Sequence, residues 1–372
     1  MLERFQLAER GFPRVAENNL RETVEAIFLK MGLDREDAKL GADVLVSADL
    51  RAVESHGVSN MLRGYVRDYQ RGQTNAHPNW HIVRESPSTA TVDCDRGLGI
   101  IVAPKAMEIA IEKARKVGIG MVTMRNGRHM GMASYHAMLA LKHDMIGLCM
   151  TDSPAEMVPT FGAEPRLGTN PIALAAPADK EAPFVFDAAT TVVAGNKIGL
   201  TRRLGVQVPG GWLADAQGSP IMSEADAPVP GYEGGGSRLL PLGSTREMGS
   251  HKGYGLACVV EILSGILTGG GYSVKIGRPN FNHMVAAYSI EAFMDTAEFK
   301  STMDEWLRML KATKPAAGHE RVFYPGLPEA EAEVERRSKG IPLHQEVLDW
   351  FKTICADLGI PNLSWQPQPA SG

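Results

Sequence analysis

The sequence has no long uninterrupted hydrophobic run, no strong excess of charge of either sign and only four cysteines among 372 residues. A net charge of −4 gives no reason to expect a nucleic acid or an anionic membrane as a partner. The most apolar long stretch, residues 255–272, contains Glu261 and several glycines, so it predicts a buried helix and not a membrane span. The cysteines are scattered without a CxxC pair, which is typical of reduced thiols and favours the cytoplasm.

Motifs that mark a metal or a common nucleotide fold are also missing. There is no HExxH and no Cys/His cluster, and His129, His136 and His143 are seven residues apart, which is roughly 10 Å along a helix and too far for one ion. We therefore expect no metal, and a metal-dependent hydrolase or lyase is disfavoured. Residues 97–99 and 118–120 read Gly-x-Gly but lack the third glycine of a Rossmann fingerprint. A dinucleotide would have to be held in another way.

The length and the hydrophobic pattern predict two domains. Residues 1–86 read as helical, and residues 276–372 as a charged helical tail, so together they predict a helical domain built from both ends of the chain. Residues 87–275 predict an α/β domain, since short apolar strands alternate with helices. Within them, residues 209–249 are rich in Gly, Pro and Ser and predict a long excursion. The expected strands are residues 89–94, 118–124, 146–150 and 184–186, and the expected helices include 20–29, 35–50, 59–70, 103–117, 132–143, 252–267, 292–310 and 329–358.

Two histidines, one beside and one near glycine, are the strongest candidates for proton chemistry, because imidazole exchanges a proton near neutral pH. His56 follows a helix and has Ser55 beside it as an orienting hydroxyl; the alternative is a helix-terminal histidine bonded to a backbone carbonyl. His129 lies in a strand-to-helix loop, where free N–H groups attract anions; the alternative is a capping or packing role.

Other polar groups could complete such a site. Asp187 ends an apolar strand, where it could orient a histidine or contact a cofactor hydroxyl; otherwise it caps a helix that begins near Thr191. His251 and Lys252 precede an apolar helix and resemble a phosphate cradle in logic, although they form no Walker motif. A further basic group could meet a phosphate or form a solvated face: Lys197, Arg202 and Arg203.

Taken in order, these segments resemble one family, the type 2 malate/L-lactate dehydrogenases, also called the sulfolactate-dehydrogenase-like oxidoreductases. The resemblance covers nearly the whole chain. The matching segments are Asp49-Leu50-Arg51, Ser55-His56-Gly57, Asp95-Arg96-Gly97-Leu98-Gly99, Arg125-Asn126 before His129, Pro159 with Phe161-Gly162, Gly168-Thr169-Asn170-Pro171, Asp187-Ala188-Ala189-Thr190, Lys252-Gly253-Tyr254-Gly255 and Tyr324-Pro325-Gly326.

The resemblance implies a non-Rossmann, mixed-sheet nucleotide-binding domain, a homodimer, and hydride transfer between NAD(H) or NADP(H) and a small 2-keto or 2-hydroxy acid. It implies that His56 donates the proton in reduction and accepts it in oxidation, with Asp187 and His129 beside it. Ser55, Thr169 and Asn170 would border the substrate. The residues implied to line the dinucleotide are Phe186, Asp187, Ala188, Ala189, Thr190, Thr191, Val192, His251, Lys252, Pro325 and Gly326.

Two departures from the family pattern concern the substrate pocket. Many relatives have an arginine four residues after the first histidine, where this chain has Asn60, so Arg51 or Arg63 is the expected replacement for binding a substrate carboxylate. Many also have serine where this chain has Gly127. The substrate therefore stays open between malate, lactate or a related acid and a cyclic imino acid such as piperideine-2-carboxylate. A nucleotide-binding relative that has lost turnover is the remaining alternative, and the choice between NAD and NADP stays open.

Overall fold

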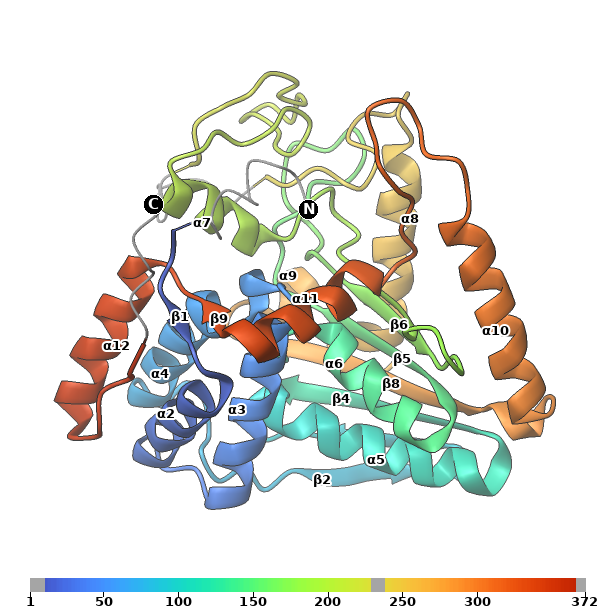
Figure 1. Ribbon diagram of the computed structural model, residues 1–372, viewed down its shortest axis with the longest axis horizontal. Helices are drawn as coiled ribbons and strands as arrows, with labels where there is room; N and C mark the ends of the chain where they lie inside the picture. Colours follow the sequence, from blue (N-terminus) through green and yellow to red (C-terminus); the bar gives the residue numbers. More distant parts are fainter. Residues whose placement is uncertain (1–10, 229–237, 366–372) are drawn as a thin grey trace.

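The computed structural model describes residues 11–228 and 238–365, and a seven-stranded sheet forms its centre (Figure 1). The strand order is β2-β3-β4-β8-β5-β6-β7, and within it β3 and β4 are parallel while the other neighbours are antiparallel. The expected mixed α/β class is confirmed, with a sheet that is mostly antiparallel. The strands are β2 (His81–Glu85), β3 (Thr89–Asp93), β4 (Ile119–Gly127), β5 (Met145–Asp152), β6 (Ile172–Ala176), β7 (Phe184–Ala188) and β8 (Phe281–Ser289).

Strand β8, which the sequence analysis did not expect, lies in the middle of the sheet between β4 and β5. Polar Asn282 and His283 interrupt its apolar pattern, yet both are buried and bonded inside the protein. β2 and β6 were not expected either. The residues of β2 and β8 therefore belong to the sheet, although the sequence analysis placed them in the helical domain.

Helices cover both faces of the sheet. Val285 and Ala287 of β8 pack in the apolar core formed with α5 (Gly99–Val117) and α6 (Ala133–Met138). Met284 and Ala286 point to the opposite face, because side chains alternate along a strand, and pack with Val260. That face is covered by α8 (Ser250–Val260) and the π-helix η5 (Glu261–Ile266), which together form the expected helix over residues 252–267.

A second apolar core joins the N-terminal helices to the end of the chain. Asp34 caps one of these helices, since its carboxylate accepts a hydrogen bond from the backbone N–H of Asp37 at 2.8 Å. In Figure 1 the last helix lies beside the first ones. Residues of α5 and α6 also reach this core, and its other elements include β1 (Arg14–Val15), α2 (Glu17–Lys30), α3 (Arg35–Leu50), α4 (Arg63–Gln70), β9 (Ile341–Pro342) and α12 (Gln345–Leu358), with β1 paired to β9.

The helical tail differs from the expectation in one respect. The stretch 329–358 is not one helix, because Gly340 adopts a φ of +86° and β9 follows it. The excursion 209–249 has no helix or strand among its described residues before α8, and residues 229–237 lie outside them. The remaining elements are η4 (Leu139–His143), α7 (Gly195–Leu204), α9 (Ser273–Ile276), η6 (Ile290–Ala292), α10 (Thr296–Lys311) and α11 (Leu327–Lys339). Within the described ranges, no helix combines the length and apolar character needed to cross a bilayer.

Candidate active site

His56 lies on a short turn whose shape is fixed from below by Asp49. The turn consists of the 3-10 helix η2 (Glu54–His56), then Gly57, then the π-helix η3 (Val58–Leu62). Asp49 Oδ2 accepts a hydrogen bond from the backbone N–H of Val58 at 2.7 Å. A Cβ at position 57 would lie 2.2 Å from Asp49 Oδ1, so only glycine fits there. Ser55 Oγ lies 2.9 Å from His56 Nδ1 and orients the ring.

The Asp49 carboxyl is fully buried, and burial raises its pKa to about 8. Its Oδ1 atom has no hydrogen-bond partner within the described parts of the chain. At neutral pH this carboxyl is therefore mostly protonated beneath the His56 turn. The sequence analysis listed Asp49 only as part of a matching segment, because nothing in its spacing shows that it lies under Gly57.

His129 stacks on His56 across 73 residues of sequence. The ring centroids lie 5.7 Å apart and the planes differ by 15°. Nδ1 of His129 accepts a hydrogen bond from the backbone N–H of Gly131 at 3.1 Å and lies 2.6 Å from the hydroxyl of Tyr65, on α4. Since a backbone N–H can only donate, Nδ1 carries no proton and the neutral ring carries it on Nε2. Tyr65 was not among the site residues expected from the sequence.

Both rings are neutral at pH 7 in the single chain. Burial lowers the pKa of His56 to about 4, and the charge of Lys197 lowers it further in the same direction. Burial also lowers the pKa of His129 well below its usual value, with smaller contributions from His56 and His283. Both side chains remain partly accessible to solvent. A neutral, accessible His56 is suited to accept a proton.

Asp187 stands at the end of β7 and contacts the helix that follows His129. Its Oδ2 accepts a hydrogen bond from the backbone N–H of Ser134 at 2.7 Å, in the first turn of α6. The alternative of a cap on a helix near Thr191 is wrong, because the next helix, α7, begins at Gly195. The Asp187 residue is exposed overall, but nearby protein atoms partly desolvate its carboxyl and so raise its pKa.

The segments expected to line a dinucleotide meet beside β7. The backbone N–H of Val185 donates to the carbonyl of Pro325 at 3.0 Å, and Gly326 packs against Val185 with a φ of +95°. Leu242 donates from its N–H to Thr190 and packs on the first turn of α8. That turn carries His251 and Lys252, both exposed. Of residues 186–192, Phe186 and Asp187 are exposed, Ala188, Ala189 and Val192 are half-buried, and Thr190 and Thr191 are buried.

The residues expected at the substrate differ in their burial and in their bonding partners. Thr169 is half-buried, and its carbonyl accepts from the N–H of Thr190 at 2.9 Å. Asn170 is fully buried, and its amide donates to the carboxylate of Glu261 at 2.8 Å. Arg51 and Arg63 both form ion pairs at 3.0 Å, with Glu333 and Glu346 respectively. Both guanidinium groups are therefore ion-paired with glutamates, and Arg63 faces α12.

The structure places both positions at which the chain departs from the family pattern. Asn60 lies in the π-helix η3. Its side chain donates to the carbonyl of Glu54 and accepts from Arg203. A Cβ at Gly127 would lie 3.1 Å from Nε2 of His283, so a serine there would press on that buried ring.

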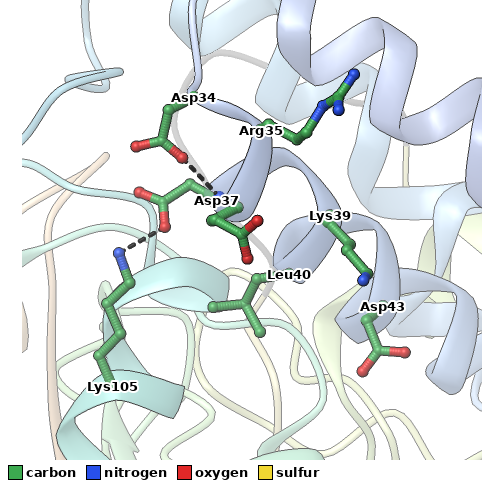
Figure 2. Close-up of a pocket in the computed structure, with 8 residues that line it drawn as sticks. Asp34, Arg35, Asp37, Lys39, Leu40, Asp43 and Lys105 are labelled. Atoms are coloured by element: carbon green, nitrogen blue, oxygen red, sulfur yellow. Dashed lines mark hydrogen bonds and ion pairs between the residues drawn. The ribbon is translucent and has the colours of Figure 1, made fainter.

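A hollow of about 600 Å³ at the start of α3 is not part of this site (Figure 2). Its charges bond one another, as in the ion pair between Asp37 and Lys105. It lies at the opposite end of the 16-residue helix α3 from His56, a separation of roughly 24 Å. Its lining consists of Asp34, Arg35, Glu36, Asp37, Lys39, Leu40, Asp43 and Lys105. No group of three or more potential metal-ligating side chains occurs among the residues that the structure describes.

The chain is similar to known dehydrogenases in both sequence and fold. Residues 15–352 match the family model for malate/L-lactate dehydrogenase. The chain is 42% identical to a malate dehydrogenase of Pyrococcus abyssi, over 95% of this chain and 98% of the relative. It is 38% identical to an L-sulfolactate dehydrogenase of Methanocaldococcus jannaschii, over 92% and 96%. The solved malate dehydrogenase of Entamoeba histolytica superimposes with a TM-score of 0.89 at 33% identity, covering 94% of this chain and 99% of that one. The chain therefore belongs to the malate/L-lactate dehydrogenase family of nicotinamide-dependent hydroxyacid oxidoreductases.

Proposed function

We propose that this chain interconverts a small 2-keto acid and its 2-hydroxy acid, with His56 as the general acid and base. The observation that carries the proposal is the stacked pair of accessible imidazoles, His56 and His129, of which the Gly131 N–H fixes the tautomer of His129. The nicotinamide supplies or accepts the hydride at the carbon that bears the oxygen. In oxidation, neutral His56 takes the hydroxyl proton as the C–H bond breaks. In reduction, protonated His56 returns it to the carbonyl oxygen as negative charge develops there.

His129 serves the same oxygen in a different way. Its Nε2 carries the proton, because Nδ1 is occupied by the Gly131 N–H. The ring is therefore a fixed neutral donor that stabilises charge on the substrate oxygen without losing its own proton. Asp187 anchors the start of α6 and so holds the loop that carries His129. Thr169 borders the same space. Ser55 orients His56, and Asn170 supports Thr169 from within the core.

The proposed cofactor site lies between β7 and the first turn of α8. The exposed Lys252 and His251 stand where the N–H groups of a helix N-terminus attract phosphate. Because Gly326 has no Cβ, the Pro325-Gly326 turn can pack closely against Val185 of β7. Because the sheet has a single parallel pair among the described strands, we propose a nucleotide-binding domain other than the Rossmann fold.

A homodimer is part of the proposal. The outer face of α8 and η5 exposes a row of large apolar side chains, and such a patch marks a protein interface. A second copy of this chain is the proposed occupant. The row consists of Leu256, Val259, Ile262, Ile266 and Leu267. We keep the division into a helical and an α/β domain as a proposal, with β2 and β8 on the α/β side. The four cysteines are free thiols, which supports a reducing, cytoplasmic location.

A substrate panel tests the function. Purified protein is mixed with NADH or NADPH and each of a set of 2-keto acids and cyclic imino acids, and the nicotinamide absorbance is followed. Turnover of a 2-keto acid supports the proposal. Turnover of imino acids alone would replace the substrate class, and tight cofactor binding without turnover of any compound would identify a binding protein.

A further inference from the structure

The proposed reaction needs a cation for the substrate carboxylate, and the expected arginines are engaged elsewhere. Arg51 and Arg63 hold Glu333 and Glu346. Arg203, which reaches Asn60, also pairs with Glu346 at 2.8 Å. The charge of each of these guanidinium groups is already offset by a carboxylate, so it attracts a second anion less strongly. The cation for the substrate should therefore be one without a close carboxylate.

Lys197 has the right position for this role. It lies in the first turn of α7, next to Asn196, whose side-chain amide donates to the carbonyl of Ser55 at 2.9 Å. That hydrogen bond fixes the start of α7 against the residue preceding His56. The charge of Lys197 is felt at the His56 ring, where it opposes protonation. The lysine therefore lies on the turn of α7 that contacts the His56 segment, within electrostatic range of the proposed acid and base.

Lys197 is also held in an unusual state for a lysine. The side chain is half-buried, and across the described residues its ammonium group makes no hydrogen bond or ion pair. Burial lowers its pKa, while the charges of Glu329 and Glu54 act in the opposite direction. Glu54 is already paired with Arg336 at 2.8 Å. A partly desolvated ammonium without a close counter-ion binds an anion more strongly than a fully hydrated one.

We propose that Lys197 binds the carboxylate of the 2-keto or 2-hydroxy acid substrate and so places the adjacent oxygen against His56. This inference rests on the proposed function and names the residue that selects carboxylate-bearing substrates. It has a second consequence. A bound carboxylate neutralises the lysine charge, which removes one of the two causes that keep His56 unprotonated. Substrate binding therefore raises the proton affinity of His56 at the moment when reduction requires the imidazolium.

Lys197 has two alternative roles, and one other cation is a candidate for the substrate carboxylate. Lys197 could serve only as a distant counter-ion of Glu329, in the first turn of α11. It could instead meet a cofactor phosphate. Arg278, whose charge reaches His129, is a weaker candidate for the carboxylate, since it is ion-paired with Glu156 and its side chain is 66% exposed.

The test compares an acid with its neutral ester. The KM and kcat of wild type, Lys197→Met, Lys197→Arg and Glu329→Gln are measured with pyruvate and with methyl pyruvate, or with the best keto acid of the panel and its methyl ester. For Lys197→Met we expect KM for the acid to rise about tenfold or more, the scale of one charge-assisted hydrogen bond, with the ester changed less than about threefold. Lys197→Arg should restore part of the acid preference. Glu329→Gln should not raise the KM for the acid.

The pH profile adds a readout that a packing defect would not move. In Lys197→Met the pH at which His56 loses its proton, seen in kcat/KM for oxidation, should shift upward. Equal losses for acid and ester would overturn the proposal and assign Lys197 to structure. Weaker NADH or NADPH binding in fluorescence titrations without substrate would overturn it in favour of a phosphate contact.

Oxamate binding, measured by calorimetry in the presence of cofactor, separates this inference from the proposed function. If oxamate binding depends on Lys197 but the protein turns over no 2-keto acid, the carboxylate-binding role of Lys197 is supported and the proposed dehydrogenase function is contradicted. If wild type and Lys197→Met bind oxamate with the same affinity, only the role of Lys197 is contradicted.

Discussion

His56 and His129 stack with their ring centroids 5.7 Å apart and their planes 15° from parallel. The two rings differ in what holds them. His129 Nδ1 faces the N–H of Gly131 and the hydroxyl of Tyr65, which fixes its tautomer. Among the described residues, the Nδ1 of His56 instead meets only the rotatable hydroxyl of Ser55. A hydroxyl can donate or accept, so His56 can change its protonation state without losing its partner. This asymmetry is why His56 is assigned proton transfer and His129 hydrogen-bond donation.

Replacing Tyr65 with phenylalanine removes one of the two groups at Nδ1 of His129. We expect kcat to fall about five- to tenfold, the scale of one neutral hydrogen bond, while KM for the cofactor is unchanged. Tyr69→Phe, on the same helix, is the matched control and should keep kcat near wild type. A Tyr65→Phe enzyme with unchanged kcat would show that the hydroxyl does not position His129.

The buried carboxyl of Asp49 predicts an unusual pH dependence of stability. Its pKa is raised to about 8 in the folded chain, so between roughly pH 4 and pH 8 the folded state binds a proton that the unfolded state has lost. Stability from this group is present at low pH and is lost as pH rises, by about 1.4 kcal/mol per unit. The difference in unfolding free energy between Asp49→Asn and wild type, from denaturant titrations at pH 6 and pH 8, should move in favour of the asparagine. A difference that stays constant would mean that Asp49 is ionised throughout.

The two reaction directions should respond differently to pH. With a pKa of about 4, His56 is already neutral above pH 6, so kcat/KM for oxidation of the hydroxy acid should be flat from pH 6 to pH 8. Reduction needs the protonated ring, so its kcat/KM should fall roughly tenfold per unit over the same range. Steady-state rates in both directions measure this. An oxidation limb centred near pH 6.5 would show that His56 titrates as an ordinary histidine.

The fold was predictable from the sequence where the apolar pattern is regular. α2, α3 and α5 repeat apolar positions every three or four residues, and β3 and β5 are short and β-prone. β8 was not predictable in this way, because both of its faces are covered and its polar Asn282 and His283 are satisfied by partners far away in the sequence. A pattern within one segment cannot show such partners.

For the candidate site, the identity of the main residues was predictable from the sequence, but their arrangement in space was not. His56, His129 and Asp187 could be chosen from the sequence, because each stands at the end of an expected element and beside glycine or an apolar run. Their mutual arrangement could not, because the stacking of His56 on His129 brings together two loops that are 73 residues apart in the sequence. The ion pairs of Arg51 and Arg63 could not be predicted either, since Glu333 and Glu346 come from helices almost three hundred residues later.

The most direct test of the account is single-turnover hydride transfer by His56→Gln, with nicotinamide absorbance followed after the enzyme–cofactor complex is mixed with substrate. Glutamine keeps a polar group of similar size but cannot take up a proton. We expect cofactor affinity within about twofold of wild type and a hydride-transfer rate lower by about 10² to 10⁴, the usual contribution of a general acid or base. A variant that transfers hydride within a few-fold of the wild-type rate would contradict the assignment of His56.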